Sequence, residues 1–182
     1  MRQALKLHPD SCCEAIARID VEIARPATAQ LEVQFFVTGK LSDLYLPIAA
    51  TPRRGDDLWQ HTCLEAFARA APGTGYCEFN FAPSMEWAAY HFDGYRRGMK
   101  VVTEMPSPDF DARTIGTTYQ LKARLELDEL AVLPGAAVWQ LGASAVIEEI
   151  SGEKSYWALA HPPGKPDFHH SEGFVHKLVP ST

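Results

Sequence analysis

Long apolar runs and long amphipathic helical patterns are both missing from this sequence of 182 residues. No stretch approaches the roughly 18 consecutive apolar residues that a membrane-spanning helix needs. No segment keeps apolar residues at helical spacing for long enough to make a major helix. The N-terminus, MRQALKLHPDSCCE, has no apolar signal core before it turns polar. The sequence therefore predicts a protein without membrane contact, and its N-terminus predicts a cytoplasmic location.

Positive charge is scarce and scattered. The chain has 17 Lys and Arg residues against 23 Asp and Glu residues, which gives a formal net charge of −6. Its only basic clusters are Arg53-Arg54 and Arg96-Arg97, and both are too short to follow a phosphate backbone. This balance argues against nucleic acid or an anionic membrane surface as a partner.

Cysteine is also sparse, with four residues in the whole chain. Four are too few for a disulfide scaffold, and a reducing compartment would keep them as thiols. Cys63 and Cys77 flank a tight connection, but a hairpin there would place Cys77 opposite Arg69. Cys12-Cys13 has no CxxC or His partner at metal-site spacing. We expect four free thiols and no bound metal.

Sequence motifs for catalysis and for cofactors are absent. The chain contains no GxSxG, HExxH, Walker or GxGxxG motif. His169 and His170 are adjacent, so in a strand they would point to opposite faces and would not chelate one ion together. No Met and His pair stands out at a spacing that would hold haem. We therefore expect no cofactor and assign no catalytic residue.

What the sequence does contain is alternation of apolar and polar residues. It is clear at residues 15–23, 31–37 and 119–125, and a period of two is typical of half-buried strands. About nine or ten such short strands joined by Pro- and Gly-containing loops predict an all-β fold, an antiparallel β-sandwich. The length suits one domain over residues 1–182.

Other segments complete the predicted sandwich. Residues 105–116 contain two prolines among small and acidic residues and predict an exposed loop, and residues 127–133 predict one helical turn. Further strands are expected at residues 2–8, 62–70, 76–81, 87–92, 100–104, 138–150, 155–160 and 173–179.

Residues 57–99 place polar side chains at every second position of two otherwise apolar strands. Glu65 on the first strand and Glu78 and Asn80 on the second share one sheet face, while Leu64 lies on the other. Such a face is either solvated surface or the floor of a polar ligand site. A buried Glu65 would need a hydrogen-bonding partner, and we expect an Arg or a Tyr.

The same stretch resembles the core of the DOMON-like superfamily, which includes the family 9 carbohydrate-binding modules. The likeness rests on Trp59, Glu65, the segment YCEFNFAP and the C-terminal segments SYWAL and PDFHH, and it extends over about residues 15–178. It is strongest to a bacterial branch of small stand-alone proteins. The resemblance implies a jelly-roll or Greek-key β-sandwich that binds sugars or, in some branches, haem. It also implies that Trp59 and Trp157 clamp a sugar ring.

The leading interpretation is a non-catalytic module that binds a small polar ligand, with a carbohydrate as the main candidate. Aromatic faces can stack on a sugar ring while polar side chains bind its hydroxyl groups. Trp87, Tyr90 and Tyr95 are further possible platforms. The alternatives are a glycosidase-type hydrolase with a carboxylate pair, and a structural or partner-binding module. No oligomeric state follows from the sequence. The predicted ligand-binding residues are Trp59, Glu65, Glu78, Asn80, Arg96, Arg97, Trp157 and His169.

Overall fold

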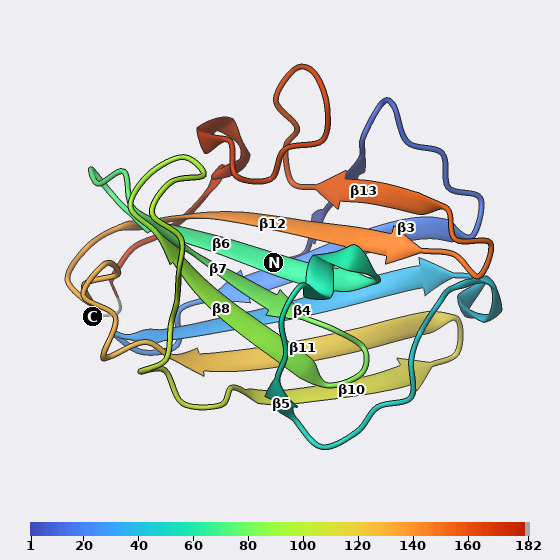
Figure 1. Cartoon of the computed structure of the whole chain (residues 1–182), viewed down its shortest axis with the longest axis horizontal. Helices are drawn as coiled ribbons and strands as arrows, with labels where there is room; N and C mark the ends of the chain where they lie inside the picture. Colours follow the sequence, from blue (N-terminus) through green and yellow to red (C-terminus); the bar gives the residue numbers. More distant parts are fainter. Residues whose placement is uncertain (181–182) are drawn as a thin grey trace.

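The computed structural model describes residues 1–180 and contains two β-sheets packed face to face (Figure 1). The smaller sheet has the strand order β1 (Gln3–Ala4), β3 (Ile16–Ala24), β4 (Gln30–Gly39), β11 (Thr118–Glu126) and β10 (Asp109–Ile115). The larger sheet has the order β2 (Lys6–Leu7), β13 (Lys154–Ala158), β12 (Trp139–Glu148), β6 (Cys63–Ala70), β7 (Tyr76–Phe81), β8 (Glu86–Phe92) and β5 (Arg53–Arg54). In addition, β14 (His176–Leu178) pairs with β12 and β9 (Lys100–Val101) pairs with β8.

The predicted antiparallel β-sandwich is confirmed. Among the strand pairs of the described chain, all are antiparallel except β5 with β8. The helical content is confined to three short 3-10 turns, η1 (Leu41–Asp43), η2 (Leu58–Gln60) and η3 (Ser171–Gly173). Residues 1–180 include no helix with the length and apolar character needed to cross a membrane.

Two segments differ from the sequence-based expectation. Residues 105–116 are not simply a loop, because β10 forms the edge of the smaller sheet and pairs with β11 along its whole length. The alternation of apolar and polar residues is weak in β10 because an edge strand of a sandwich needs few core residues. In β10 only Phe110 is buried. Residues 127–133 form successive turns and no helix, closed by bonds from Leu130 N to Leu127 O and from Leu133 N to Leu130 O.

The N-terminal segment, expected to form one strand over residues 2–8, forms two short strands. β1 pairs with β3 in the smaller sheet, whereas β2 pairs with β13 in the larger one. The chain passes from one sheet to the other at Leu5, which is buried between them. Residues 2–8 thus close one side of the sandwich.

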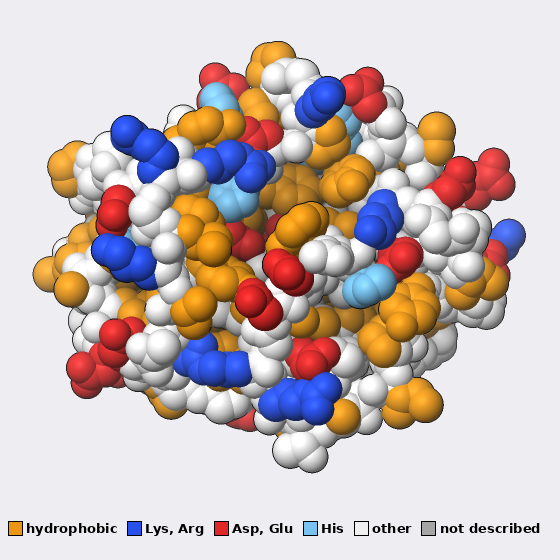
Figure 2. Space-filling view, in the orientation of Figure 1, with side chains coloured by type: hydrophobic (Ala, Val, Ile, Leu, Met, Phe, Trp, Pro, Cys, Tyr) orange, Lys and Arg blue, Asp and Glu red, His pale blue; other side chains and the backbone are white. Residues whose placement is uncertain are grey.

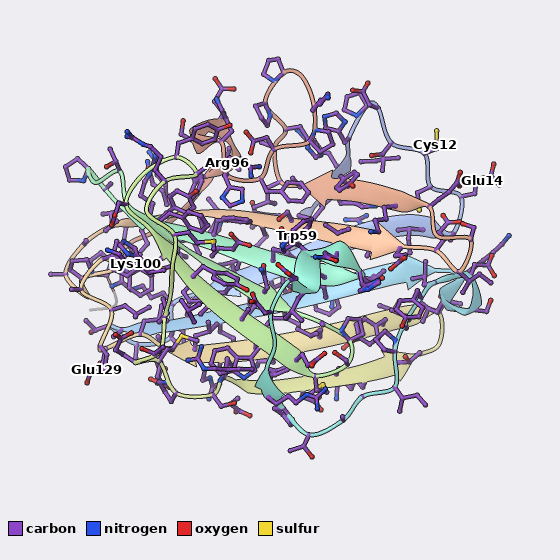
Figure 3. All side chains as sticks on the ribbon, viewed as in Figure 1. Cys12, Glu14, Trp59, Arg96, Lys100 and Glu129 are labelled. Atoms are coloured by element: carbon purple, nitrogen blue, oxygen red, sulfur yellow. The ribbon has the colours of Figure 1, made fainter. Side chains whose placement is uncertain are left out.

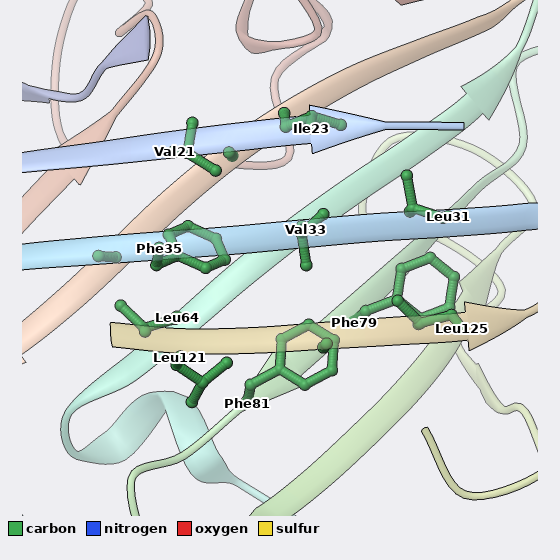
Figure 4. Packing of buried hydrophobic residues seen from close by; sticks show 14 of the residues in the cluster. Val21, Ile23, Leu31, Val33, Phe35, Leu64, Phe79, Phe81, Leu121 and Leu125 are labelled. Carbon is green, nitrogen blue, oxygen red and sulfur yellow. The ribbon is translucent and has the colours of Figure 1, made fainter. Parts of the chain in front are cut away.

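The core lies between the two sheets (Figure 4). Alternating residues of β3, β4 and β11, such as Val21, Phe35 and Leu121, point inward from the smaller sheet. Leu64 and Phe79 meet them from the larger sheet, as the period-two pattern predicts. The opposite face of β6 and β7 points away from this core. Most of its residues are also buried, and the candidate site lies on this outer face.

All four cysteines are free. Cys77 lies opposite Ala68, one residue from the predicted pairing with Arg69, because the β6–β7 connection is not centred on the expected residue. Cys63 and Cys77 lie on opposite faces of the larger sheet, so they do not approach each other.

Substitution of Phe79 should test the importance of the inter-sheet core. Phe79 is fully buried, so Phe79→Ala removes a large apolar side chain and leaves a cavity. We expect a loss of about 3–5 kcal/mol in the free energy of unfolding, measured by urea denaturation. The matched control is Ile115→Ala on exposed β10, which should change it by less than about 0.5 kcal/mol. Equal effects at the two positions would contradict this assignment of the core.

Candidate functional site

The outer face of the larger sheet is covered in part by loops. η2, the segment between β8 and β9, and the chain that follows β13 all lie over this face (Figure 1). Beneath them is a second apolar cluster that includes Phe67, Tyr76, Tyr90, Phe92 and Phe174. β6 and β7 are therefore buried on both faces, and every residue of β7 is buried.

A cavity of about 510 Å³ lies within this covered face. The space-filling view shows the corresponding surface hollowed, with acidic side chains among hydrophobic ones (Figure 2). The cavity is lined by Asp56, Asp57, Trp59, Glu65, Glu78, Tyr90, Phe92, Arg96, Met99, Val146, Lys154, Tyr156, Pro166, Phe168 and His169.

Two carboxyl groups form the polar part of the cavity floor. Glu65 and Glu78 come from neighbouring strands and share one face, with Glu65 opposite Asn80 in the register. They expose only 2% and 6% of their surface. Glu65 accepts a 2.9 Å hydrogen bond from the hydroxyl of Ser144, and Glu78 accepts a 2.8 Å bond from the amide of Asn80.

Burial changes the ionisation of both carboxyl groups. Desolvation, followed by the negative charge of Glu78, raises the pKa of Glu65 to about 8. Desolvation also raises the pKa of Glu78, against the opposing effects of Asn80 and Arg96. At neutral pH the pair therefore retains a proton.

His169 borders the same floor as a neutral imidazole. Its Nδ1 lies 2.8 Å from the hydroxyl of Tyr76, and its Nε2 lies 3.7 Å from a carboxyl oxygen of Glu78. Desolvation, then the charge of Arg96, lowers the pKa of His169 to about 4. The ring can therefore exchange hydrogen bonds with a ligand without bringing a charge.

Arg96 is held at the rim by a short network. Its guanidinium lies 2.8 Å from Asp167, which also accepts a 2.5 Å hydrogen bond from the hydroxyl of Tyr95. The backbone of Arg96 has a φ of +50°, in the left-handed region that non-glycine residues rarely adopt. Its N–H donates to Tyr76 at 3.2 Å. A strained backbone retained beside a cavity is common at binding sites.

Aromatic side chains supply the walls. Trp59 on η2 is 53% exposed and Tyr90 on β8 is buried, with its hydroxyl donating to Asp56. Trp59 and Arg96 extend over the same side of the larger sheet, from different loops (Figure 3). The site thus combines flat apolar surfaces with a few fixed polar groups, as small-molecule sites usually do.

Five of the predicted ligand-binding residues line the cavity: Trp59, Glu65, Glu78, Arg96 and His169. Asn80 is fully buried and acts on the site by holding Glu78. Arg97 is exposed and is not among the lining residues, because the turn that aims Arg96 inward directs Arg97 elsewhere. Of the further platforms, Tyr90 lines the cavity, Tyr95 supports its rim and Trp87 lies in the core.

The expected place of Trp157 in the cleft is wrong. Trp157 lies in the core between the sheets, where its indole donates a 3.0 Å hydrogen bond to Ser155. Strand alternation gives the reason, since Tyr156 pairs with Val146 and both of these residues face the cavity. The sequence predicts this strand, but the placement of Trp157 in the cleft rests on the family resemblance, which the side-chain alternation of β13 does not follow.

The partner of Glu65 also differs from the expected Arg or Tyr. Ser144 stands directly opposite Glu65 in the pairing of β12 with β6, so the shortest route to a hydrogen bond is across the ladder. Nothing in the sequence marks Ser144 within its apolar segment. Asp56 also reaches the cavity, where it accepts a hydrogen bond from the hydroxyl of Tyr90.

No model of a protein family matches this chain, and no curated protein matches it in sequence. Solved structures do match its fold. One is a proposed carbohydrate-binding protein from Bacteroides uniformis, with a TM-score of 0.72 and 12% identity over 96% of this chain and 84% of that one.

Two further matches are structures of a family 9 carbohydrate-binding module from Caldicellulosiruptor kristjanssonii. The complex with glucose gives a TM-score of 0.53 and 10% identity over 97% of this chain and 84% of that one. The complex with cellotriose gives 0.56 and 11% over 100% and 84%. At these identities the likeness establishes the fold: a β-sandwich like that of the family 9 modules.

The raised pKa of Glu65 predicts a pH-dependent stability. The folded protein holds this proton more tightly than an unfolded chain, so the stabilisation is complete below about pH 4.5 and is lost as the pH rises to about 8. Between these values the free energy of unfolding should fall by at least about 1 kcal/mol more in the wild type than in Glu65→Gln. Urea denaturation across the pH range measures the difference.

The control for this measurement is Glu129→Gln, at an exposed turn. That variant should follow the wild-type pH profile. If Glu65→Gln also followed it, the protonated state of Glu65 would be excluded.

Proposed function

We propose that the protein is a non-catalytic carbohydrate-binding β-sandwich that takes a sugar in the cavity on the outer face of its larger sheet. We also propose that it belongs to the DOMON-like superfamily and acts in the cytoplasm. The ring lies against Trp59, and its hydroxyl groups bind the carboxyl groups of Glu65 and Glu78 and the imidazole of His169.

The observation that carries this proposal is a pair of buried carboxyl groups facing an open cavity. Glu65 and Glu78 are 2% and 6% exposed, on a sheet face that they share with buried apolar residues such as Phe67 and Tyr90. A protein stabilised only by packing gains nothing from such groups, since burying them without full hydrogen bonding costs free energy. A polar ligand supplies the missing donors.

The likeness in fold supports the choice of a sugar. The family 9 modules with this fold were solved with glucose and with cellotriose. Trp59 supports it too, because it is the exposed tryptophan among four, and the other three are 7% exposed or less. An exposed indole beside buried polar groups suits a molecule with an apolar ring face and a hydroxylated edge.

Sugar binding is tested by calorimetric titration with a panel of mono- and disaccharides. We expect saturable binding by the wild type and a loss of about tenfold or more in affinity for Trp59→Ala, because truncation removes the stacking face. In the wild type, the fluorescence of Trp59 should change during the same titration.

Tyr45→Ala is the matched control, since Tyr45 is 46% exposed and does not line the cavity. It should bind as the wild type does. Absence of binding across the whole panel, or binding that is unaffected by Trp59→Ala, would contradict the proposal.

A further inference from the structure

Each carboxyl group on the cavity floor has one oxygen that the protein leaves open. Glu65 accepts from Ser144 at Oε2, and among the described residues nothing donates to its Oε1. Glu78 accepts from Asn80 at Oε1, while its Oε2 lies 3.7 Å from His169, beyond hydrogen-bonding distance. A molecule in the cavity thus meets two acceptor oxygens from adjacent strands.

In the described chain no cationic side chain donates a hydrogen bond to these two groups, although the charge of Arg96 partly offsets the rise that burial causes in the pKa of both. His169 is neutral because burial lowers its pKa to about 4. Arg96 reaches the cavity rim, but Asp167 lies 2.8 Å from its guanidinium and offsets its charge. A buried carboxylate without a paired cation is costly, so the pair is suited to a positive group supplied from outside.

The other charged side chains that line the cavity also favour a positively charged ligand. The whole lining contains four carboxyl groups and two cationic side chains: Asp56, Asp57, Glu65 and Glu78 against Arg96 and Lys154. Carboxyl groups outnumber cationic side chains in this lining, and an excess of acidic groups favours a ligand of positive charge. The faces of Trp59 and Tyr90 also favour a cation, through the negative potential of their rings.

The chemistry of the floor fits an ammonium group better than a metal ion. Nowhere in residues 1–180 do three or more His, Cys, Asp or Glu side chains gather in a way that could hold a metal. An ammonium group carries one charge and three N–H donors, so two carboxyl oxygens and one further acceptor satisfy it.

We propose that the sugar bound in this cavity is an amino sugar, and that its protonated amine lies between the open oxygens of Glu65 and Glu78. This inference rests on the proposed function and narrows the proposed ligand to one class of sugars. The amine is the charged anchor, and the remaining hydroxyl groups face His169 and the rim.

In this arrangement the protonated amine takes the place of the proton that the Glu65–Glu78 pair holds in the free protein. Burial and the charge of Glu78 raise the pKa of Glu65 to about 8, so the free pair holds a proton at neutral pH. An ammonium group between the oxygens expels that proton to solvent, whereas a neutral sugar leaves it in place. The other titratable groups that line the cavity are Asp56, Asp57, Tyr90, Arg96, Lys154, Tyr156 and His169.

The test compares matched pairs of sugars by calorimetry near neutral pH: glucose with glucosamine, galactose with galactosamine, and mannose with mannosamine. For the pair that binds best, the amino sugar should bind about tenfold tighter or more than its neutral counterpart. Titrations in two buffers of different ionisation enthalpy should show proton release with the amino sugar only. The N-acetyl derivative, which has no charge, should lose the preference.

Glu78→Gln keeps the size of the side chain and removes its charge. Glu78 also contacts the proposed neutral sugar, so the readout is the ratio of the two affinities: the preference for the amino sugar over its neutral counterpart should fall most of the way to one, whatever the change in affinity for the neutral sugar. Glu129→Gln, at an exposed turn, is the charge-matched control and should keep the preference.

The outcomes separate this inference from the function on which it rests. A neutral sugar that binds as tightly as its amino counterpart overturns the inference and leaves the carbohydrate site standing. A preference for the amino sugar without proton release, or one that survives Glu78→Gln, overturns the assignment to this pair. If no sugar of any pair binds, both proposals fail.

Discussion

The structure depends on one constraint: β6 and β7 are buried on both of their faces. One face must complete the core against the smaller sheet, with residues such as Leu64 and Phe79. The other face lies under loops, yet it carries Glu65 and Glu78. Because side chains alternate along a strand, the core and the polar floor are fixed by the same backbone. The floor of the cavity is thus formed by the same strands that complete the core.

Desolvation is the second consequence of that constraint. In water both carboxyl groups would be ionised at neutral pH, but burial raises the pKa of each. Ser144 donates a hydrogen bond to one oxygen of Glu65, and Asn80 donates one to one oxygen of Glu78. The loops then set what can enter. η2 brings Trp59, and the segment after β8 brings Arg96, held by Asp167. A rigid polar floor under loop-borne walls is the usual division of labour in binding proteins.

Alternation in the sequence was sufficient to predict the sandwich, and it placed Glu65, Glu78 and Asn80 on one face. The placement of Trp157 in the cleft rests on the family resemblance instead, and in β13 it is Tyr156 that faces the cavity. Alternation misses β10 because a polar edge strand resembles a loop. Ser144 was invisible because its role depends on which residue stands opposite in a distant strand. No local pattern contains the register between strands, so the hydrogen bond of Ser144 to Glu65 could not be predicted from the sequence.

The most direct test of this account is an experimental structure of the protein with the sugar that binds it best. We predict that the sugar lies over the outer face of β6 and β7, in contact with Trp59 and within hydrogen-bonding distance of Glu65 and Glu78. A sugar bound elsewhere, with this cavity left empty, would contradict the central claim that the buried carboxyl pair forms the floor of a carbohydrate site.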